Sequence, residues 1–199
     1  MITGWSPFEN VNSMSVSSDE KTLITRAQRG DKMAISTLYS AHVQAIYKYV
    51  RYRVDTDAQA EDITSEVFLR MVRELPRYQY TGAPLSAWLY RTAYNIIVDT
   101  HRNQRFQAPQ ELPEDLASEY SDPVDTFALA QDHEQLRAAL KTLSPDYQNV
   151  LVLRFINDVS HAEVAEIMGK TEASARVLQH RALKALGAAL QQLQQRGVR

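Results

Sequence analysis

Apolar residues recur at intervals of three and four along most of this chain, a spacing typical of α-helices that bury one face. The clearest case runs from Pro84 to Phe106, whose predicted inner face holds Leu85, Leu89, Ala93, Ile96 and Thr100, with Trp88 and Ile97 alongside. Its outer face holds Arg91, Asn95, Val98, Arg102 and Arg105, flanked by Tyr94, His101 and Gln104. Such a face suits a phosphate backbone with bases to stack or hydrogen-bond. An ordinary amphipathic helix with a solvated basic face has the same pattern, so this stretch alone leaves both interpretations open.

Three further helices are predicted before this stretch: one opened by a Ser17–Glu20 capping box and ended by Gly30, one from Asp31 to about Tyr52, and one from Thr56–Gln59 to Pro76. The apolar side of the third is predicted to hold Ala60, Ile63, Val67, Leu69, Met71 and Leu75. His42 lies at the edge of the second helix's apolar side and is interpreted as a packed histidine. Four helices with short turns predict a compact all-helical first module.

The C-terminal part of the chain is predicted to be helical as well: a helix over about Thr126–Thr142, one capped by Ser144, one opened by a Ser160–Glu163 capping box, and a last one from Thr171 to about Leu193. The final pair, with a turn of about three residues that contains Gly169, is typical of a helix-turn-helix. The second helix of that motif would place its N-terminal half in a DNA major groove, here with Glu172, Ser174, Arg176, Gln179, His180 and Arg181. A plain helical hairpin has the same spacing and stays open.

Charge is divided unevenly along the chain. The formal net charge is −2, yet residues 107–135 hold eight Asp or Glu and no Lys or Arg. Residues 107–124 also hold three prolines, which indicates a linker that could span roughly 60 Å, or about 17 base pairs of duplex. The predicted fold is therefore all-α, with a flexible tail (1–17), a first helical domain (18–106), a flexible acidic linker (107–130) and a second helical domain (131–195).

Composition excludes several classes of protein. The chain has no cysteine, which rules out a disulfide framework and fits a cytoplasmic protein. Its five histidines lack ligand spacing, so no metal is expected. Its six glycines are scattered and build no phosphate-cradling loop, and no cofactor is expected. No apolar run is long enough to insert into a membrane, and no targeting segment is apparent. No nucleophile–base set or pair of loop carboxylates indicates an enzyme.

Three motifs occur in an order that identifies a family. The first matches at Ala60, Glu61, Asp62, Ile63, Glu66, Phe68 and Leu69; the second at Ser86, Trp88, Leu89, Tyr90, Arg91, Ala93 and Asn95; the third at Leu143–Pro145, Glu163–Ile167 and His180–Ala182. Together they resemble regions 2.2, 2.3–2.4 and 4 of the bacterial RNA polymerase sigma factors of the sigma-70 family, extracytoplasmic-function (ECF) group. The resemblance implies a transcription initiation factor that recognises a melted −10 element and a duplex −35 element.

The resemblance also implies roles for particular residues. Core polymerase would be contacted by Asp62, Glu66, Leu69, Arg70 and Arg73. The −10 strand would be contacted by Tyr80, Gly82, Trp88, Arg91, Asn95 and Arg102, and the −35 duplex by Thr171, Ser174, Arg176, Val177, His180 and Arg181. The implied partners are the β′ clamp for region 2, the β flap for region 4, promoter DNA, and an anti-sigma factor as the common source of control in this family.

The chain departs from the family pattern at Thr81, where a basic residue is usual, and at Tyr94, where a basic or small residue is frequent. It also departs at Val177, Leu178 and Gln179 in the last helix. These departures leave the recognised bases open. The competing interpretation is a stand-alone helix-turn-helix regulator that binds an operator as a dimer. The acidic segment argues against it, because phosphate contacts supply most non-specific DNA affinity.

Overall fold

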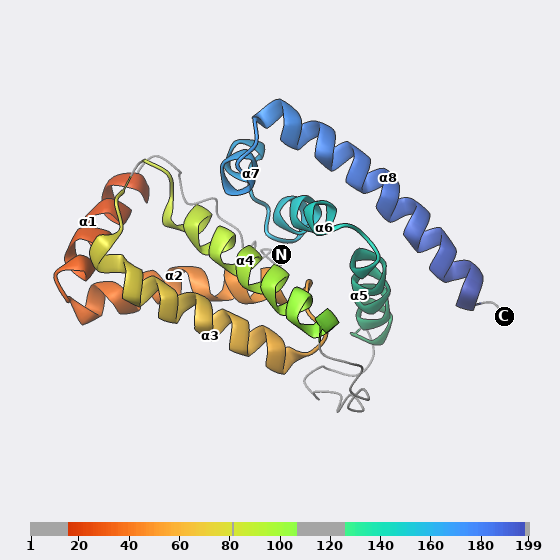
Figure 1. Ribbon diagram of the computed structural model, residues 1–199, viewed down its shortest axis with the longest axis horizontal. Coiled ribbons are helices and arrows are strands. Elements are labelled where there is room, and N and C mark those ends of the chain that lie inside the picture. Colours follow the sequence, from red (N-terminus) through yellow and green to blue (C-terminus); the bar gives the residue numbers. More distant parts are fainter. Residues whose placement is uncertain (1–15, 81, 107–125, 198–199) are drawn as a thin grey trace, which may run out of the picture.

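The structure is a computed structural model that describes residues 16–80, 82–106 and 126–197. Within these ranges the chain is helical and contains no strand (Figure 1). The helices of the first body are α1 (Val16–Gln28), α2 (Lys32–Arg51), α3 (Asp57–Glu74), the 3₁₀ turn η1 (Leu75–Arg77) and α4 (Leu85–Phe106). Those of the second body are α5 (Thr126–Lys141), α6 (Pro145–Leu151), the π-helical turn η2 (Val152–Ile156), α7 (His161–Met168) and α8 (Glu172–Gly197). The predicted all-α class is confirmed, while residues 1–15 and 107–125 of the predicted tail and linker lie outside the described residues.

Local capping explains where the helices of the first body begin. The Asp31 carboxylate accepts hydrogen bonds from the backbone N–H groups of Met33 and Ala34 at the start of α2. A hydrogen bond from Arg26, together with these backbone donors, lowers the pKa of Asp31. Thr56 Oγ1 accepts from the Gln59 N–H at the start of α3. These caps agree with the sequence, because each depends only on residues a few positions apart.

Two expectations for the first body were wrong. Leu69 does not face the core of α3: its side chain is 53% exposed, and the adjacent Phe68 is buried instead. Helix α1 already begins at Val16, before the predicted cap residue Ser17, and the buried Glu20 carboxylate accepts from the Leu85 N–H at the start of α4. Glu20 also lies 3.7 Å from His42 Nε2, which makes the half-buried His42 part of the packing between helices.

The second body contains one confirmed capping box and one unexpected turn. Ser160 and Glu163 bond each other's backbone N–H groups at the start of α7, and Gly169 ends that helix in the left-handed conformation, with φ of +62°. Ser144 occupies the N-cap position of α6 but makes no side-chain cap bond. The π-helical turn η2 was not foreseen; it leaves Phe155 55% exposed and places Asn157 at its end.

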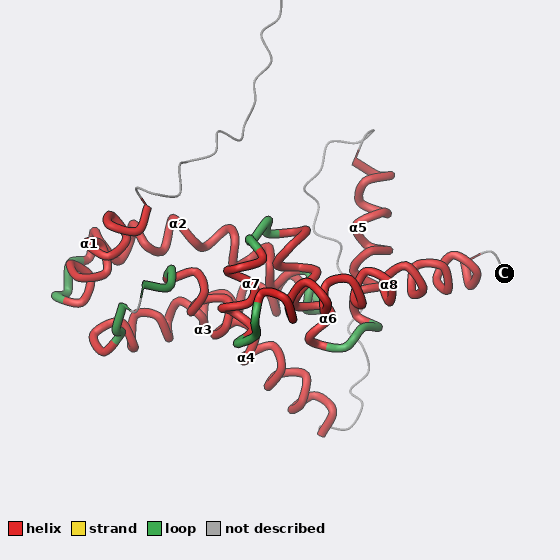
Figure 2. The backbone as a smooth tube through the Cα atoms, turned by 90° about the horizontal axis from the view of Figure 1, so that it is seen from above, coloured by secondary structure: helices red, strands yellow, loops and turns green. Residues whose placement is uncertain are grey.

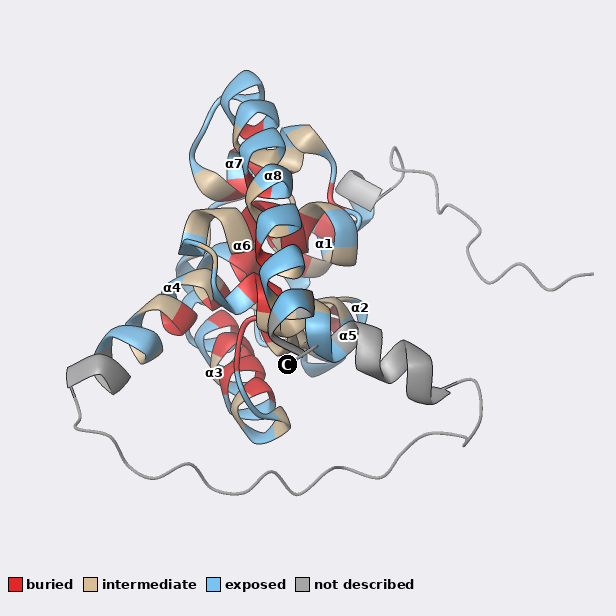
Figure 3. Ribbon diagram, turned by 90° about the vertical axis from the view of Figure 1, so that its right-hand side faces the viewer, coloured by how far each residue is buried: buried red, intermediate tan, exposed pale blue. Residues whose placement is uncertain are grey.

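The two bodies pack against each other where α4 meets α7 and α2 meets η2, and α6 adds side-chain hydrogen bonds to α2 and α4 (Figures 1 and 2). Buried apolar residues from both, such as Tyr49 and Leu89 in the first and Val150 and Val164 in the second, belong to one continuous cluster (Figure 3). The C-terminal half of α8 extends beyond this contact and packs on α5 (Figure 2). The chain therefore forms a closed arrangement in which two modules share a core.

Two glycines of the second body should respond oppositely to the same substitution. Gly169→Ala adds a methyl group to a left-handed residue and should destabilise the protein by ~1–2 kcal/mol. Gly187→Ala lies within α8, where no atom would meet the new Cβ, and should stabilise it by about 0.5–1 kcal/mol. Urea unfolding followed by circular dichroism measures both. Equal signs for the two variants would contradict the assignment of Gly169 as the helix stop.

Candidate nucleic-acid interface

Helices α7 and α8 form a helix-turn-helix whose second helix is open to solvent. The turn consists of Gly169, Lys170 and Thr171, and Thr171 Oγ1 caps α8 by accepting from the Ser174 backbone N–H at 3.2 Å. All six residues predicted to face duplex DNA are exposed: Thr171, Ser174, Arg176, Val177, His180 and Arg181. The N-terminal half of α8 is thus free to enter a major groove.

The side chains at this end of α8 surround a shallow hollow of about 400 Å³. Lys170, Ala173, Ser174, Val177, Leu178 and Arg181 line it. Arg176 pairs with Glu172 of the same helix at 2.5 Å, whereas no described carboxylate lies within ion-pair distance of Arg181. An unpaired arginine beside small and apolar side chains suits a base edge with a neighbouring thymine methyl group.

The residues predicted to contact a melted strand lie on and before α4. Arg91, Asn95 and Arg102 are exposed on its outer face, and Arg102 lies 3.5 Å from Asp99. Tyr80 and Trp88 are half-buried, and the exposed Gly82 has φ of +93°. The Trp88 ring meets Tyr78 edge-on, with 6.4 Å between their centres, so the tryptophan is held by the first body. The side chain of Arg105 lies outside the described residues.

Part of this α4 face forms hydrogen bonds with the second body. Arg91 Nη2 donates to the carbonyl oxygen of Glu166 at 2.7 Å, and Arg91 Nε donates to that of Ile167 at 3.4 Å. These carbonyls belong to the last turn of α7, where the helix dipole places partial negative charge. Tyr94 donates its phenol proton to Asp146 of α6, at 3.2 Å. A cavity of about 320 Å³ between the bodies is lined by Arg91, Tyr94 and Asn95 on one side and by Asp146, Asn149 and Gly169 on the other.

The outer face of α3 presents a second surface. Asp62, Leu69, Arg70 and Arg73 are exposed there, and Glu66 is paired with Arg70 at 2.7 Å. The hydrogen bond from Arg70 lowers the pKa of the Glu66 carboxyl. Two apolar neighbours are exposed here as well: Val72 on α3, which the sequence did not single out, and Tyr39 of α2, which its helical spacing placed on the inner side. The Tyr39 ring packs against Phe68, with 4.8 Å between the ring centres. Apolar side chains surrounded by charge are typical of a protein-binding surface.

The contact between the bodies contains a buried polar cluster that sequence analysis also missed. We call it the Arg53 cluster: Tyr49, Arg53 and Asn149. Tyr49 donates its phenol proton to Asn149 Oδ1 at 2.7 Å, and Arg53 donates to Tyr49 and, at 3.3 Å, to Asn149 Oδ1. The guanidinium lies 5.1 Å from the centre of the Tyr94 ring, in cation–π geometry. Burial raises the pKa of Tyr49.

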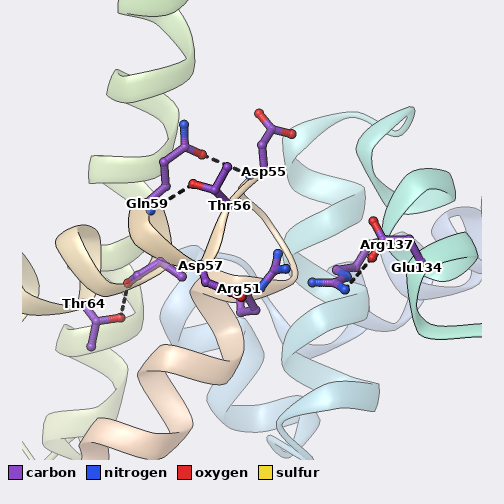
Figure 4. A network of polar contacts seen from close by, with 9 residues as sticks. Arg51, Asp55, Thr56, Asp57, Gln59, Thr64, Glu134 and Arg137 are labelled. Atoms are coloured by element: carbon purple, nitrogen blue, oxygen red, sulfur yellow. Dashed lines mark hydrogen bonds and ion pairs between the residues drawn. The ribbon is translucent and has the colours of Figure 1, made fainter. Parts of the chain in front are cut away.

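Polar contacts flank the Arg53 cluster on both sides. On one side Asn157 Nδ2, from the second body, donates to the Ala45 carbonyl at 2.7 Å and to the Tyr90 phenol at 3.2 Å. On the other side Lys141 of α5 pairs with Asp55 at 2.7 Å. Figure 4 shows this second side, where Arg51 bonds Asp57 at the α2–α3 turn and Arg137 bonds Glu134 on α5.

The described residues show neither a metal-binding cluster nor a membrane-spanning helix. No group of three or more His, Cys, Asp or Glu side chains there is arranged to hold a metal ion. No described helix combines the length and the apolar character needed to cross a bilayer.

The fold and these surfaces define a helical nucleic-acid-binding protein with a helix-turn-helix in its second body and a cation- and amide-bearing helix in its first. Two family models match it: Sigma-70 region 2 over residues 38–107, and Sigma-70, region 4 over residues 133–186. The chain belongs to the sigma-70 family, in its ECF group of RNA polymerase sigma factors.

Individual relatives agree with this assignment. The chain is 37% identical over 166 residues to the ECF RNA polymerase sigma factor BldN of Streptomyces coelicolor, an alignment that covers 82% of this chain and 63% of BldN. It is 30% identical over 171 residues to the ECF sigma factor SigD of Mycobacterium bovis, covering 82% of this chain and 80% of SigD.

Solved structures share the fold. CnrH, in complex with the cytosolic domain of CnrY, matches with a TM-score of 0.67 at 21% identity, covering 86% of this chain and 97% of CnrH. The sigma factor RpoE, in complex with the anti-sigma factor NepR from Bartonella quintana, matches with a TM-score of 0.59 at 16% identity, covering 78% of this chain and 96% of RpoE.

The burial of Tyr90 beneath Asn157 gives the contact between the bodies a pH dependence. Burial raises the pKa of Tyr90 from 10.0 to about 12. Because the pKa is raised in the folded state, the Tyr90 phenol loses its proton at a lower pH in the unfolded chain than in the folded one. The contribution of Tyr90 to the free energy of unfolding is therefore complete below pH 10. It is lost between about pH 10 and pH 12, by at most roughly 3 kcal/mol. We expect the urea-unfolding free energy of the wild type to fall more steeply across this range than that of Tyr90→Phe. Parallel curves would contradict a buried phenol.

Proposed function

We propose that this chain is a transcription initiation factor that binds core RNA polymerase and directs it to promoters. It would recognise a −35 element as duplex and a −10 element as a melted strand. The observation that carries the proposal is the open N-terminal half of α8, with Arg181 unpaired, in a chain of the sigma-70 family. A bidentate arginine–guanine contact there would supply ~1–3 kcal/mol of discrimination.

The first body would serve two partners. Arg91, Asn95 and Arg102 on α4, with the aromatic rings of Tyr80 and Trp88, suit a single strand whose bases stack or hydrogen-bond beside cations. The α3 face of Asp62, Glu66, Leu69, Arg70 and Arg73 suits the β′ clamp of core polymerase, because exposed Leu69 and Val72 lie within a charged surface. These assignments follow the family resemblance residue by residue.

The second body would also contact polymerase, at the β flap. Exposed Phe155 and Leu183 on that body support a protein contact besides the DNA contact. An anti-sigma factor is a further proposed partner, supported by the sigma factor RpoE, which shares this fold and is seen with the anti-sigma factor NepR. The role is non-catalytic and cytoplasmic, where core polymerase acts.

A gel-shift experiment tests the function directly. Promoter fragments recovered by footprinting reconstituted holoenzyme on genomic DNA should be shifted by the chain with core polymerase, and not by the chain alone. The reason is charge: a chain with net charge −2 and an acidic stretch between its modules gains little from phosphate contacts by itself. A tight, salt-sensitive shift by the purified chain alone would instead support a stand-alone operator-binding regulator.

Arg181→Ala should separate promoter recognition from polymerase binding. We expect promoter affinity of the holoenzyme to fall by roughly 5- to 150-fold, because one groove-facing guanidinium is lost, with unchanged affinity for core polymerase. Glu66→Lys on the α3 face is the reciprocal control and should weaken co-purification with core. Equal loss of both activities in Arg181→Ala would indicate misfolding, and an unchanged promoter affinity would remove Arg181 from the groove.

A further inference from the structure

We propose that helix α1 positions the surface assigned above to the −10 strand, because two of its side chains, those of Gln28 and Glu20, hold the two ends of the connection between η1 and α4. The aromatic rings of Tyr80 and Trp88 would thereby be kept in place to receive a base of the melted strand. The proposal rests on the function proposed above. It gives a role to a helix that precedes residues 38–107, the range matched by the Sigma-70 region 2 model.

Gln28, the last residue of α1, holds the start of the connection. Its Nε2 donates to the carbonyl oxygen of Tyr78 at 2.6 Å and to that of Leu75 at 3.2 Å. Leu75 begins η1 and is only 2% exposed, while Tyr78 follows η1 with an extended backbone. One amide group from a distant part of the sequence therefore fixes the point at which the chain leaves the helical turn.

Glu20 holds the other end of the connection. This residue is only 8% exposed, and both of its carboxylate oxygens lie 3.3 Å from the backbone nitrogen of Leu85, the first residue of α4. The N–H groups of the first turn of a helix lack an acceptor within the helix, and the helix dipole favours negative charge beside them. Pro84, the residue before α4, has no side-chain acceptor, so this cap comes from a different helix.

The two anchored points lie beside the Trp88 ring. Tyr78, whose carbonyl is held by Gln28, meets Trp88 edge-on with 6.4 Å between the ring centres. Leu85, whose N–H is held by Glu20, lies in the same turn of α4 as Trp88. Burial, followed by the negative charge of Glu20, raises the pKa of the Tyr78 phenol, as expected for a ring close to that carboxylate. A displacement at either anchor would therefore move the tryptophan ring.

A positioning role differs from a merely stabilising one in what it affects. The α3 face proposed for core polymerase and the α4 face proposed for the −10 strand share the core of the first body. A general loss of stability would therefore weaken both contacts together. Discrimination between bases depends instead on side chains held within about 0.5 Å of their working positions. Loss of an α1 anchor should thus lower −10 discrimination while core binding is retained.

Binding of reconstituted holoenzyme to forked promoter DNA tests the proposal. The fork has a duplex −35 element and a single-stranded −10 element, taken from a fragment recovered by footprinting, and each −10 base is replaced in turn. The measured quantity is the ratio of affinities for the original and the base-substituted forks. Thr56→Ala is the matched control, because Thr56 Oγ1 caps α3 in the same body and no printed contact joins it to α1 or to the start of α4.

We expect Glu20→Ala to lower this ratio about five- to tenfold, with unchanged affinity for core polymerase and for the −35 duplex. Glu20→Gln keeps an acceptor oxygen and should restore most of the ratio. Gln28→Glu keeps the shape of the side chain but replaces its donor group with an acceptor. It should lower the ratio in the same direction, and it covers the case in which Glu20→Ala fails to fold. Thr56→Ala should leave the ratio unchanged.

The failure of this proposal and the failure of the proposed function give different results. A wild-type ratio in both Glu20→Ala and Gln28→Glu, or an equal fall in Thr56→Ala, would overturn the positioning role of α1 even where core-dependent promoter binding is intact. A wild-type chain that binds no core polymerase, or whose holoenzyme does not distinguish the −10 bases, would instead overturn the proposed function.

Discussion

The structure depends on how one buried cation is accommodated. Arg53 lies at the junction of the two bodies, held by Tyr49 and Asn149 and facing the Tyr94 ring, and no carboxylate among the described residues lies within ion-pair distance of it. A contact that depends on an uncompensated charge is specific in orientation but limited in strength. Under the proposed function the two modules would be together in the free chain and apart on a promoter, and a contact of limited strength suits that change.

The charge distribution along the chain also bears on its function. Acidic residues are concentrated between the modules, and the cations proposed to contact DNA lie on α4 and α8, so neither module alone would present a strong positive potential to DNA. Under the proposed function, affinity for DNA would then depend on core polymerase. The apolar side chains within the charged α3 face supply a surface through which such a partner could hold the chain.

Features that depend on neighbouring residues could be predicted from the sequence. Asp31, Thr56, Ser160 and Gly169 mark helix ends, because each cap involves positions within three or four residues. Leu69 was misplaced because residues one position apart on a helix differ in direction by about 100°, and Phe68 takes the inward place.

The contact between the bodies could not be predicted in the same way. Arg53 and Asn149 are 96 positions apart, and isolated polar residues leave no periodic signal. The π-helical turn that precedes Asn157 likewise has no local sequence signature. What the sequence did indicate about the site was the set of outward residues on α3, α4 and α8. That the second body itself occupies Arg91 and Tyr94 emerged only from the packing.

The most direct measurement of this account is transcription by polymerase reconstituted with a chain whose bodies are covalently joined. Asp55 and Lys141, an ion pair across the contact, can be replaced by cysteines and linked with a short, cleavable thiol reagent, with each single-cysteine chain as control. The account predicts that the linked chain supports no promoter-specific initiation and that cleavage of the link restores it. Full transcription by the linked chain would contradict it.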